Sequence, residues 1–221
     1  MSNFKVITAD PAWSFSDKLP GKSRGAENNY QCMTLQDIKD FPLLPHDKDC
    51  YLFLWRVSAM VEEAYEVCRA WGFAPKSEIV WQKLTKNGKH WFGMGRHVRA
   101  SHETCIVATK GRPKPKVRNI RSTFSASVGR HSEKPEEFYD IVEKMCEGSY
   151  LELFARRHRP GWVCLGNELE QPKKTREDFL KFSKSLPEWP ASIMAVPGDC
   201  QTGVLESLLN EQIRKGLEEI E

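Results

Sequence analysis

The sequence predicts an α/β protein in which a mostly parallel sheet is sandwiched between helices. Short apolar segments typical of buried strands alternate along the chain with segments of helical periodicity. Residues that cap or break helices stand at the ends of the helical segments. Since successive strand–helix–strand units place their strands in parallel, this order predicts a parallel sheet with helices on both faces.

Six segments are predicted strands because each is short and largely apolar. The run CYLFLW is apolar at every position, which is typical of a strand buried on both faces. Basic loops are expected from Lys83 to about His102 and again from Lys110 to Ser122. The predicted strands are Phe4–Ala9, Cys50–Trp55, Ser77–Trp81, Glu103–Thr109, Tyr150–Phe154 and Trp162–Leu165.

Three helices are predicted between these strands. Thr34 takes the N-cap position of the first and Ser58 that of the second, because a hydroxyl there accepts a hydrogen bond from the first helical turn. The second helix ends at Gly72, and the third begins at Pro135, whose fixed φ suits the start of a helix. The two longer helices each carry one apolar stripe, so each covers the sheet with one face.

The chain changes character after residue 171. We expect residues 1–171 to form the sheet domain. A polar break at 172–174 is followed by helix-like pieces near 175–185 and 203–219, which a proline-containing stretch separates. Residues 172–221 are therefore expected to be a C-terminal helical extension that either docks on the domain or serves assembly.

The composition is that of a globular protein, with 40% apolar and 29% charged residues, and excludes a disordered chain. No apolar run reaches the roughly 18 residues of a membrane-spanning helix. The first residues lack a secretory leader, so we expect a cytoplasmic protein without membrane contact. Seven cysteines without a C-x-x-C pair and six histidines without an H-x-x-x-H pair predict reduced core cysteines and no metal site.

Positive charge is concentrated in one segment, although the whole chain has a formal net charge of only +3. From Lys83 to Arg121, eleven basic residues accompany one acid, Glu103, while the rest of the chain holds 22 basic and 29 acidic residues. This segregation favours a polyanionic partner, nucleic acid first, and the alternative is a set of solvated loops. Trp91 and Phe92 interleave with the basic residues and suit base stacking. The candidate nucleic-acid contacts are Lys83, Lys86, Lys89, Arg96, Arg99, Lys114 and Lys116.

The first predicted strand is followed by the run Asp10-Pro11-Ala12-Trp13. In open α/β sheets, ligands bind at the carboxyl ends of the strands. A carboxylate and a backbone carbonyl there would accept hydrogen bonds from an exocyclic amine such as adenine N6 and keep its lone pair available for methyl transfer. An aromatic ring would stack on the flipped base. The alternative is an ordinary Asp-Pro turn followed by a core tryptophan.

The same run resembles the Asp-Pro-Pro-Trp motif of the MT-A70 family of S-adenosylmethionine-dependent adenine-N6 methyltransferases. Further segments resemble the family in the same order, ending with LELFARRHRPGWVCLGNEL, so the resemblance covers about residues 7–169. It implies a Rossmann-like methyltransferase sheet with a permuted motif order, in which the catalytic strand comes first. It also implies S-adenosylmethionine as the cofactor and residues 1–171 as the catalytic domain.

The resemblance assigns roles residue by residue. Asp10 and the Pro11 carbonyl match the groups that hold the target amine, and Trp13 matches the family's aromatic residue, so these three are the catalytic candidates. Lys134 matches the lysine that reaches the methionine end of the cofactor. Two later stretches match the family's F-x-R-x-H and G-N-[QE] motifs. The cofactor-binding candidates are Asp10, Lys134, Phe154, Arg156, His158, Asn167 and Glu168.

One departure from the family motif is Ala12, which stands where the family has a second proline, so we expect a less rigid turn. The activity implied is methylation of adenine N6 in nucleic acid, with DNA favoured over RNA. The alternatives are an RNA adenine-N6 methyltransferase and a catalytically silent, nucleic-acid-binding partner subunit of the same fold. Assembly as a homo-oligomer or with a partner subunit stays open.

Overall fold

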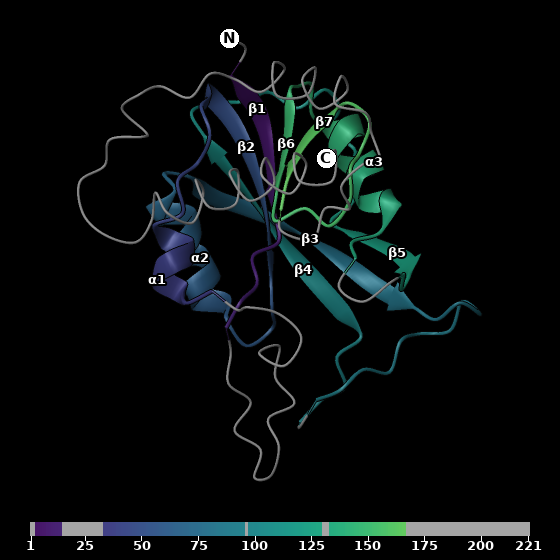
Figure 1. Cartoon of the computed structure of the whole chain (residues 1–221). Coiled ribbons are helices and arrows are strands. Elements are labelled where there is room, and N and C mark those ends of the chain that lie inside the picture. The colour runs from purple at the N-terminus through teal and green to yellow at the C-terminus, as the bar shows by residue number, and fades with distance from the viewer. Residues whose placement is uncertain (1–2, 15–32, 96, 130–132, 167–221) are drawn as a thin grey trace, which may run out of the picture.

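The computed structural model describes residues 3–14, 33–95, 97–129 and 133–166. The predicted extension at 172–221 and the candidates Arg96, Asn167 and Glu168 lie outside these residues. The described residues form one seven-stranded sheet with three helices (Figure 1). The strands are β1 (Phe4–Ala9), β2 (His46–Arg56), β3 (Ala74–Leu84), β4 (His102–Lys110), β5 (Thr123–Ser127), β6 (Tyr150–Leu153) and β7 (Trp162–Leu165).

The strands follow the order β5-β3-β4-β2-β1-β6-β7 across the sheet. Neighbouring strands are parallel except in the two pairs made by β4, which runs antiparallel to β2 and to β3. The predicted α/β architecture with a mostly parallel sheet is therefore confirmed. Because β4 is reversed, its amino end lies at the edge where its neighbours β2 and β3 have their carboxyl ends.

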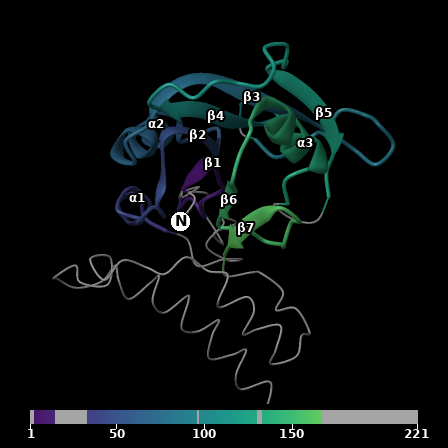
Figure 2. The ribbon, with the colours of Figure 1, turned by 90° about the horizontal axis from the view of Figure 1, so that it is seen from above.

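Helices cover both faces of this sheet. The helices are α1 (Leu35–Lys39), α2 (Val61–Ala70) and α3 (Glu136–Met145). Figure 2 shows α1 and α2 on one face and α3 on the other. On β2, Leu52 and Leu54 belong to the apolar cluster of the α1 and α2 face, while Phe53 and Trp55 belong to that of α3. The prediction of a strand buried on both faces is thus confirmed.

The start of α1 agrees with the prediction, and that of α2 does not. The Thr34 hydroxyl accepts a hydrogen bond from the Asp37 N–H at 3.1 Å, and the Asp37 carboxylate accepts one from the Thr34 N–H at 3.1 Å, which completes a capping box. The prediction of Ser58 as the N-cap of α2 is wrong, because Met60 occupies that position. The Met60 side chain is buried, and this burial fixes the start of the helix in place of a hydroxyl cap. The end of α2 is as predicted, since Gly72 adopts a φ of 80°.

Two strands, β3 and β5, differ most from the prediction. β3 runs on to Leu84, past the predicted end at Trp81, so Lys83 belongs to a strand and not to a loop. β5 has no counterpart among the predicted strands. It is an edge strand in which only Ala126 is buried, and its apolar signal is correspondingly weak.

The five described cysteines are all free and buried. Burial raises the pKa of the thiols of Cys50, Cys68 and Cys146 to about 12, which keeps them protonated and unreactive. The prediction of reduced core cysteines is confirmed for these five. Within the described part of the chain, no helix is long and apolar enough to cross a membrane. The same residues contain no group of three His, Cys, Asp or Glu side chains placed to hold a metal ion.

Candidate active site

The fold gathers side chains from distant segments at one edge of the sheet. β2 is parallel to β1 and antiparallel to β4. Asp10, which follows β1, and Glu103, at the start of β4, therefore lie at the same edge of the sheet. Lys134 reaches this edge from the segment before α3, and Phe154 and Arg156 reach it from the segment after β6. A ligand at this edge would meet residues from β1, β2, α3 and β6 and from the segments beside them.

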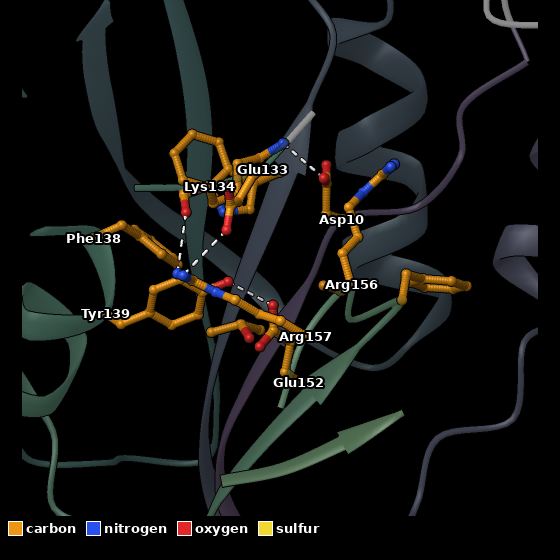
Figure 3. A pocket seen from close by; sticks show the side chains of 12 residues that line it. Asp10, Glu133, Lys134, Phe138, Tyr139, Glu152, Arg156 and Arg157 are labelled. Carbon is orange, nitrogen blue, oxygen red and sulfur yellow. Dashed lines mark hydrogen bonds and ion pairs between the residues drawn. The ribbon is translucent and has the colours of Figure 1, made fainter. Parts of the chain in front are cut away.

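These segments surround a cleft, which Figure 3 shows from close by. Four of the predicted site residues line it, namely Asp10, Lys134, Phe154 and Arg156. The cleft combines carboxylates, cations and aromatic rings, so it offers partners for both charges of a zwitterion. Its lining residues are Thr8, Ala9, Asp10, Trp55, Glu133, Lys134, Phe138, Tyr139, Glu152, Phe154, Arg156 and Arg157.

Acidic and basic side chains alternate in a row along this edge, which we call the charged row: Asp10, Lys134, Glu103 and Lys83. The Lys134 ammonium donates a hydrogen bond to Asp10 Oδ2 at 2.6 Å and lies 3.3 Å from Glu103 Oε2. The other Glu103 oxygen, Oε1, accepts a hydrogen bond from the Lys83 ammonium. Lys134 is therefore held between two carboxylates, with a side chain only 8% exposed.

The pKa of Lys134 is raised above its usual value. Burial alone would lower this pKa, but the neighbouring carboxylates of Asp10 and Glu103 outweigh burial. Burial alone would likewise raise the pKa of Glu103, and the ammonium groups of Lys134 and Lys83 reverse that effect and lower it. Both groups are thus charged at neutral pH, and each favours the charged form of the other.

Two tryptophan rings lie against the charged row. Lys134 Nζ is 5.1 Å from the centroid of the Trp55 ring, and Lys83 Nζ is 5.0 Å from that of Trp81. The two rings meet edge to face, with their centroids 6.5 Å apart. Ring faces attract cations, so this pair of rings supports the positions of both ammonium groups.

The turn after β1 places the Asp10 carboxylate at the mouth of the cleft. The Pro11 carbonyl accepts a hydrogen bond from the Trp13 N–H at 2.8 Å, and the Ala12 carbonyl accepts one from the Met33 N–H at 2.9 Å. A carbonyl oxygen has two lone pairs, so Pro11 retains one for a ligand. These hydrogen bonds hold the turn in shape although Ala12 replaces a proline.

The structure contradicts the stacking role predicted for Trp13. Its ring belongs to the apolar core and is only 4% exposed. Its indole N–H donates a hydrogen bond to the Trp55 carbonyl at 3.0 Å. The ring therefore anchors the turn to β2, and it offers no free face to a base in this conformation.

Arg157, which occupies no motif position, fixes the segment that carries Lys134. Its guanidinium lies 3.1 Å from Glu133 Oε1 and also pairs with Glu136, while it donates a 3.5 Å hydrogen bond to the Lys134 carbonyl. Nearby, the Tyr139 hydroxyl donates a 2.5 Å hydrogen bond to Glu152. Burial raises the pKa of Glu152, so this carboxyl is a weaker acid than usual.

The segment after β6 has an unusual backbone. Phe154 adopts a φ of 62°, in the left-handed region that side chains other than glycine rarely occupy. Its ring lies 4.8 Å from that of Phe41, centroid to centroid, so packing holds the strained residue. Strain of this kind is concentrated at ligand-binding sites, and here it turns the chain so that Phe154 and Arg156 both line the cleft.

We expect Gly166→Ala to lower the free energy of unfolding by about 1–3 kcal/mol, the usual cost of overpacking. An added Cβ would lie 2.0 Å from the Ala155 oxygen and 2.6 Å from its nitrogen. Ala155 cannot yield easily, because its N–H donates a 2.8 Å hydrogen bond to the Leu165 carbonyl. Urea unfolding measures the effect. Gly148→Ala is the matched control, since its Cβ would meet only side chains, at 3.1 Å or more, and an equal loss in both variants would contradict this account.

The remaining candidates are scattered over the molecule. His158 is exposed and does not line the cleft. Lys83 is engaged with Glu103, and its side chain is only 18% exposed, so we withdraw it from the nucleic-acid surface. Lys86, Lys89 and Arg99 are exposed in the loop between β3 and β4.

Lys114 and Lys116 lie at the opposite edge of the sheet from Asp10. They follow the carboxyl end of β4, which the register with β2 places far from the cleft. The Lys116 ammonium donates a 2.9 Å hydrogen bond to the Glu143 carbonyl, and its N–H donates one of 2.7 Å to the Met145 carbonyl. Lys116 therefore satisfies the carboxyl end of α3, and this part of the predicted nucleic-acid surface gains no support from its position.

A comparison with known proteins identifies relatives. The MT-A70 family model matches residues 4–168. The chain is 30% identical to the N(6)-adenosine-methyltransferase subunit METTL3 of Danio rerio, over 85% of this chain and 32% of that protein. It is 29% identical to the human N(6)-adenosine-methyltransferase catalytic subunit METTL3, over the same shares. It is 27% identical to the N(6)-adenine-specific methyltransferase METTL4 of Mus musculus, over 75% of this chain and 37% of that protein. The chain thus spans about a third of the length of these relatives.

Proposed function

Because the chain belongs to the MT-A70 family, we propose that it transfers a methyl group from S-adenosylmethionine to the N6 amine of adenine in nucleic acid. Enzymes of this family use S-adenosylmethionine as their methyl donor. The observation that carries the proposal is the cleft that brings Asp10, Lys134, Phe154 and Arg156 together at the sheet edge. These residues come from three separate segments and match the family's motifs.

The chemistry of the cleft suits this cofactor. The methionine end of S-adenosylmethionine carries a carboxylate and an ammonium, and the cleft offers Lys134 to the first and the carboxylates of Asp10 and Glu152 to the second. The sulfonium is a cation, which aromatic faces such as those of Trp55 and Phe154 accommodate. The buried indole N–H of Trp55 makes no hydrogen bond to any described residue, so a donor also remains for a ligand.

When bound, S-adenosylmethionine supplies an electrophilic methyl carbon. Asp10 accepts a hydrogen bond from the adenine amine, and the free lone pair of the Pro11 carbonyl accepts a second. Both hydrogen bonds draw the nitrogen lone pair out of conjugation with the ring. The nitrogen–carbon bond would form as the carbon–sulfur bond breaks, the sulfur would keep the electron pair of that bond, and the amine would give one proton to solvent water. Asp10 is the carboxylate placed to stabilise the positive charge that builds on the nitrogen before that proton leaves.

Binding of the cofactor would change the partners of Lys134. In the structure its ammonium donates a hydrogen bond to Asp10 Oδ2 and so neutralises the carboxylate that the target amine would use. A cofactor carboxylate near Lys134 would compete for the ammonium and release Asp10. Glu103, 3.3 Å from the same ammonium, keeps the lysine at the cleft during this exchange. We therefore propose that the cofactor binds before the base.

RNA is the substrate that the comparisons favour within this proposal. Relatives are named as N(6)-adenosine methyltransferases, and adenosine is a ribonucleoside. The name of METTL4 specifies adenine and leaves the sugar open. The expectation of DNA over RNA gains no support from the cleft, because none of its described residues distinguishes the two sugars. The substrate surface that we propose is the loop between β3 and β4, with Lys86, Lys89 and Arg99 as phosphate contacts.

In the test, the full chain is incubated with labelled S-adenosylmethionine and, in separate reactions, with single-stranded RNA, single-stranded DNA or duplex DNA. Transfer of label to adenine N6, identified by nucleoside digestion and mass spectrometry, is the expected result. Cofactor binding is measured separately by calorimetry. No label in any adenine, with or without added partner subunits, would overturn the enzymatic proposal. Absence of both label and cofactor binding would favour the silent partner subunit.

A further inference from the structure

The loop between β3 and β4 carries an exposed apolar patch. Only five large apolar side chains are exposed among the described residues, and four of them belong to this loop. Phe92 is 75% exposed, Met94 77%, Val98 80% and Trp91 38%. Exposed apolar side chains that gather in this way mark interaction sites.

The loop is built to hold this patch in place. The Trp91 N–H donates a 2.9 Å hydrogen bond to the Lys83 carbonyl, and the Gly93 N–H donates one of the same length to the Ala100 carbonyl. The two sides of the loop approach so closely that a Cβ on Gly93 would lie 2.3 Å from the Ala100 carbonyl oxygen. The base of the loop therefore has a defined shape, and Phe92 projects from a supported position.

The charges around the patch are all positive. No acidic residue occurs between Glu78 and Glu103, while Lys86, Lys89 and Arg99 are exposed in the loop. The Arg99 guanidinium lies over the Phe92 ring, 4.9 Å from its centroid. An aromatic face beside a planar cation is the combination on which unpaired nucleobases stack. Lysine is depleted at protein–protein interfaces, so the lysines around this patch favour nucleic acid over a protein partner.

The loop also projects from the edge of the sheet that carries the charged row. It connects the end of β3 with the start of β4, and Figure 1 shows it at the edge where β1 ends. Its two ends adjoin Lys83 and Glu103 of the charged row, and the Lys83 N–H donates a 2.9 Å hydrogen bond to the Ser101 carbonyl. A strand entering the cleft would therefore pass this loop.

We propose that the loop binds single-stranded nucleic acid by stacking an unpaired base, a neighbour of the target adenine, on the face of the Phe92 ring opposite to Arg99. Lys86 and Lys89 contact the adjoining phosphates. Paired bases present no free face to a ring, so the chain prefers single strands to duplexes. This inference rests on the proposed function, since it takes nucleic acid as the substrate.

The experiment measures binding of fluorescein-labelled 12-nucleotide single strands and duplexes, of RNA and DNA, by anisotropy without cofactor. Phe92→Leu keeps an apolar side chain and removes the ring. We expect it to weaken single-strand binding by about 5- to 150-fold, the range for loss of one base–aromatic stack. Phe92→Trp should bind as wild type does. Met94→Ala is the matched control, because it removes an equally exposed apolar side chain without a ring, and it should change the Kd less than about twofold.

Two results would overturn the inference. The first is a Phe92→Leu Kd equal to that of wild type. The second is equal weakening by Phe92→Leu and Met94→Ala together with loss of self-association in sedimentation, which would make the loop a protein interface. The inference and the proposed function fail separately. If binding depends on the Phe92 ring but no methyl group is transferred, only the proposed function is refuted. If methyl transfer occurs and its KM for the strand is the same in Phe92→Leu and wild type, only the inference is refuted.

Discussion

Asp10→Asn is expected to lower the rate of methyl transfer by about 100- to 1,000-fold, as loss of one preorganised electrostatic contact does in other enzymes. Asparagine keeps the shape of the side chain and one acceptor oxygen. It loses the negative charge that stabilises the amine nitrogen as it becomes positive. Cofactor affinity should change by only a few-fold, because Lys134 retains Glu103 as its second carboxylate partner and Glu152 remains in the cleft for the cofactor ammonium.

The measurement separates the two effects. Single-turnover transfer to a saturating strand reports the chemical step, and calorimetry reports cofactor binding. Asp140→Asn is the matched control, since Asp140 is exposed on α3 and does not line the cleft. It should retain the wild-type rate. Transfer by Asp10→Asn at the wild-type rate would remove Asp10 from the chemistry.

The sequence predicts the central sheet because its strands are buried on both faces. Cys50–Trp55 has no polar residue, so only one assignment fits it. β5 contributes one buried residue to the core and leaves no comparable pattern. Pairing of β5 with β3 depends on long-range contacts, which local sequence does not encode. Edge strands are for this reason harder to predict than central ones.

The site was predictable where a residue belongs to a motif, as with Asp10 and Lys134. Glu103 belongs to no such motif, but one signal could have identified it, since it is the single acidic residue among eleven basic residues between Lys83 and Arg121. An acid in that setting is a candidate for a structural ion pair. Arg157 and Glu133 leave no signal, because their roles come from the fold that brings α3 beside β6. The motif did not predict that the Trp13 ring is buried, because a motif does not specify in which direction a ring points.

Lys134→Met should weaken cofactor binding by about 10- to 150-fold, the equivalent of one charge-assisted hydrogen bond. Methionine fills similar space without an ammonium. Calorimetry on the full chain gives the affinity directly. Lys144→Met, at the exposed end of α3, is the matched control and should bind cofactor as the wild type does.

The same variant should also change how stability depends on pH. In the wild type the lowered pKa of Glu103 stabilises the fold above its unfolded pKa of about 4.3, and this contribution is lost as the pH falls through the folded pKa. The raised pKa of Lys134 contributes stability below about pH 10.4, which is lost as the pH rises through its folded pKa. Between these limits both contributions are present, and Lys134→Met removes them together.

Without the ammonium, Asp10 and Glu103 are carboxylates at one edge with only Lys83 to neutralise them, and burial then raises the pKa of Glu103. The stability lost by Lys134→Met should therefore be largest between pH 6 and 9, and it should shrink as the pH falls below about 4.3 and through the folded pKa of Glu103, where this carboxyl becomes protonated. Urea unfolding across that range measures it. The double variant Asp10→Asn/Lys134→Met should be more stable at neutral pH than Lys134→Met alone, because it removes one of the unpaired charges. A loss independent of pH would mean that Lys134 supports the fold by packing alone and that the charged row is not an electrostatic unit.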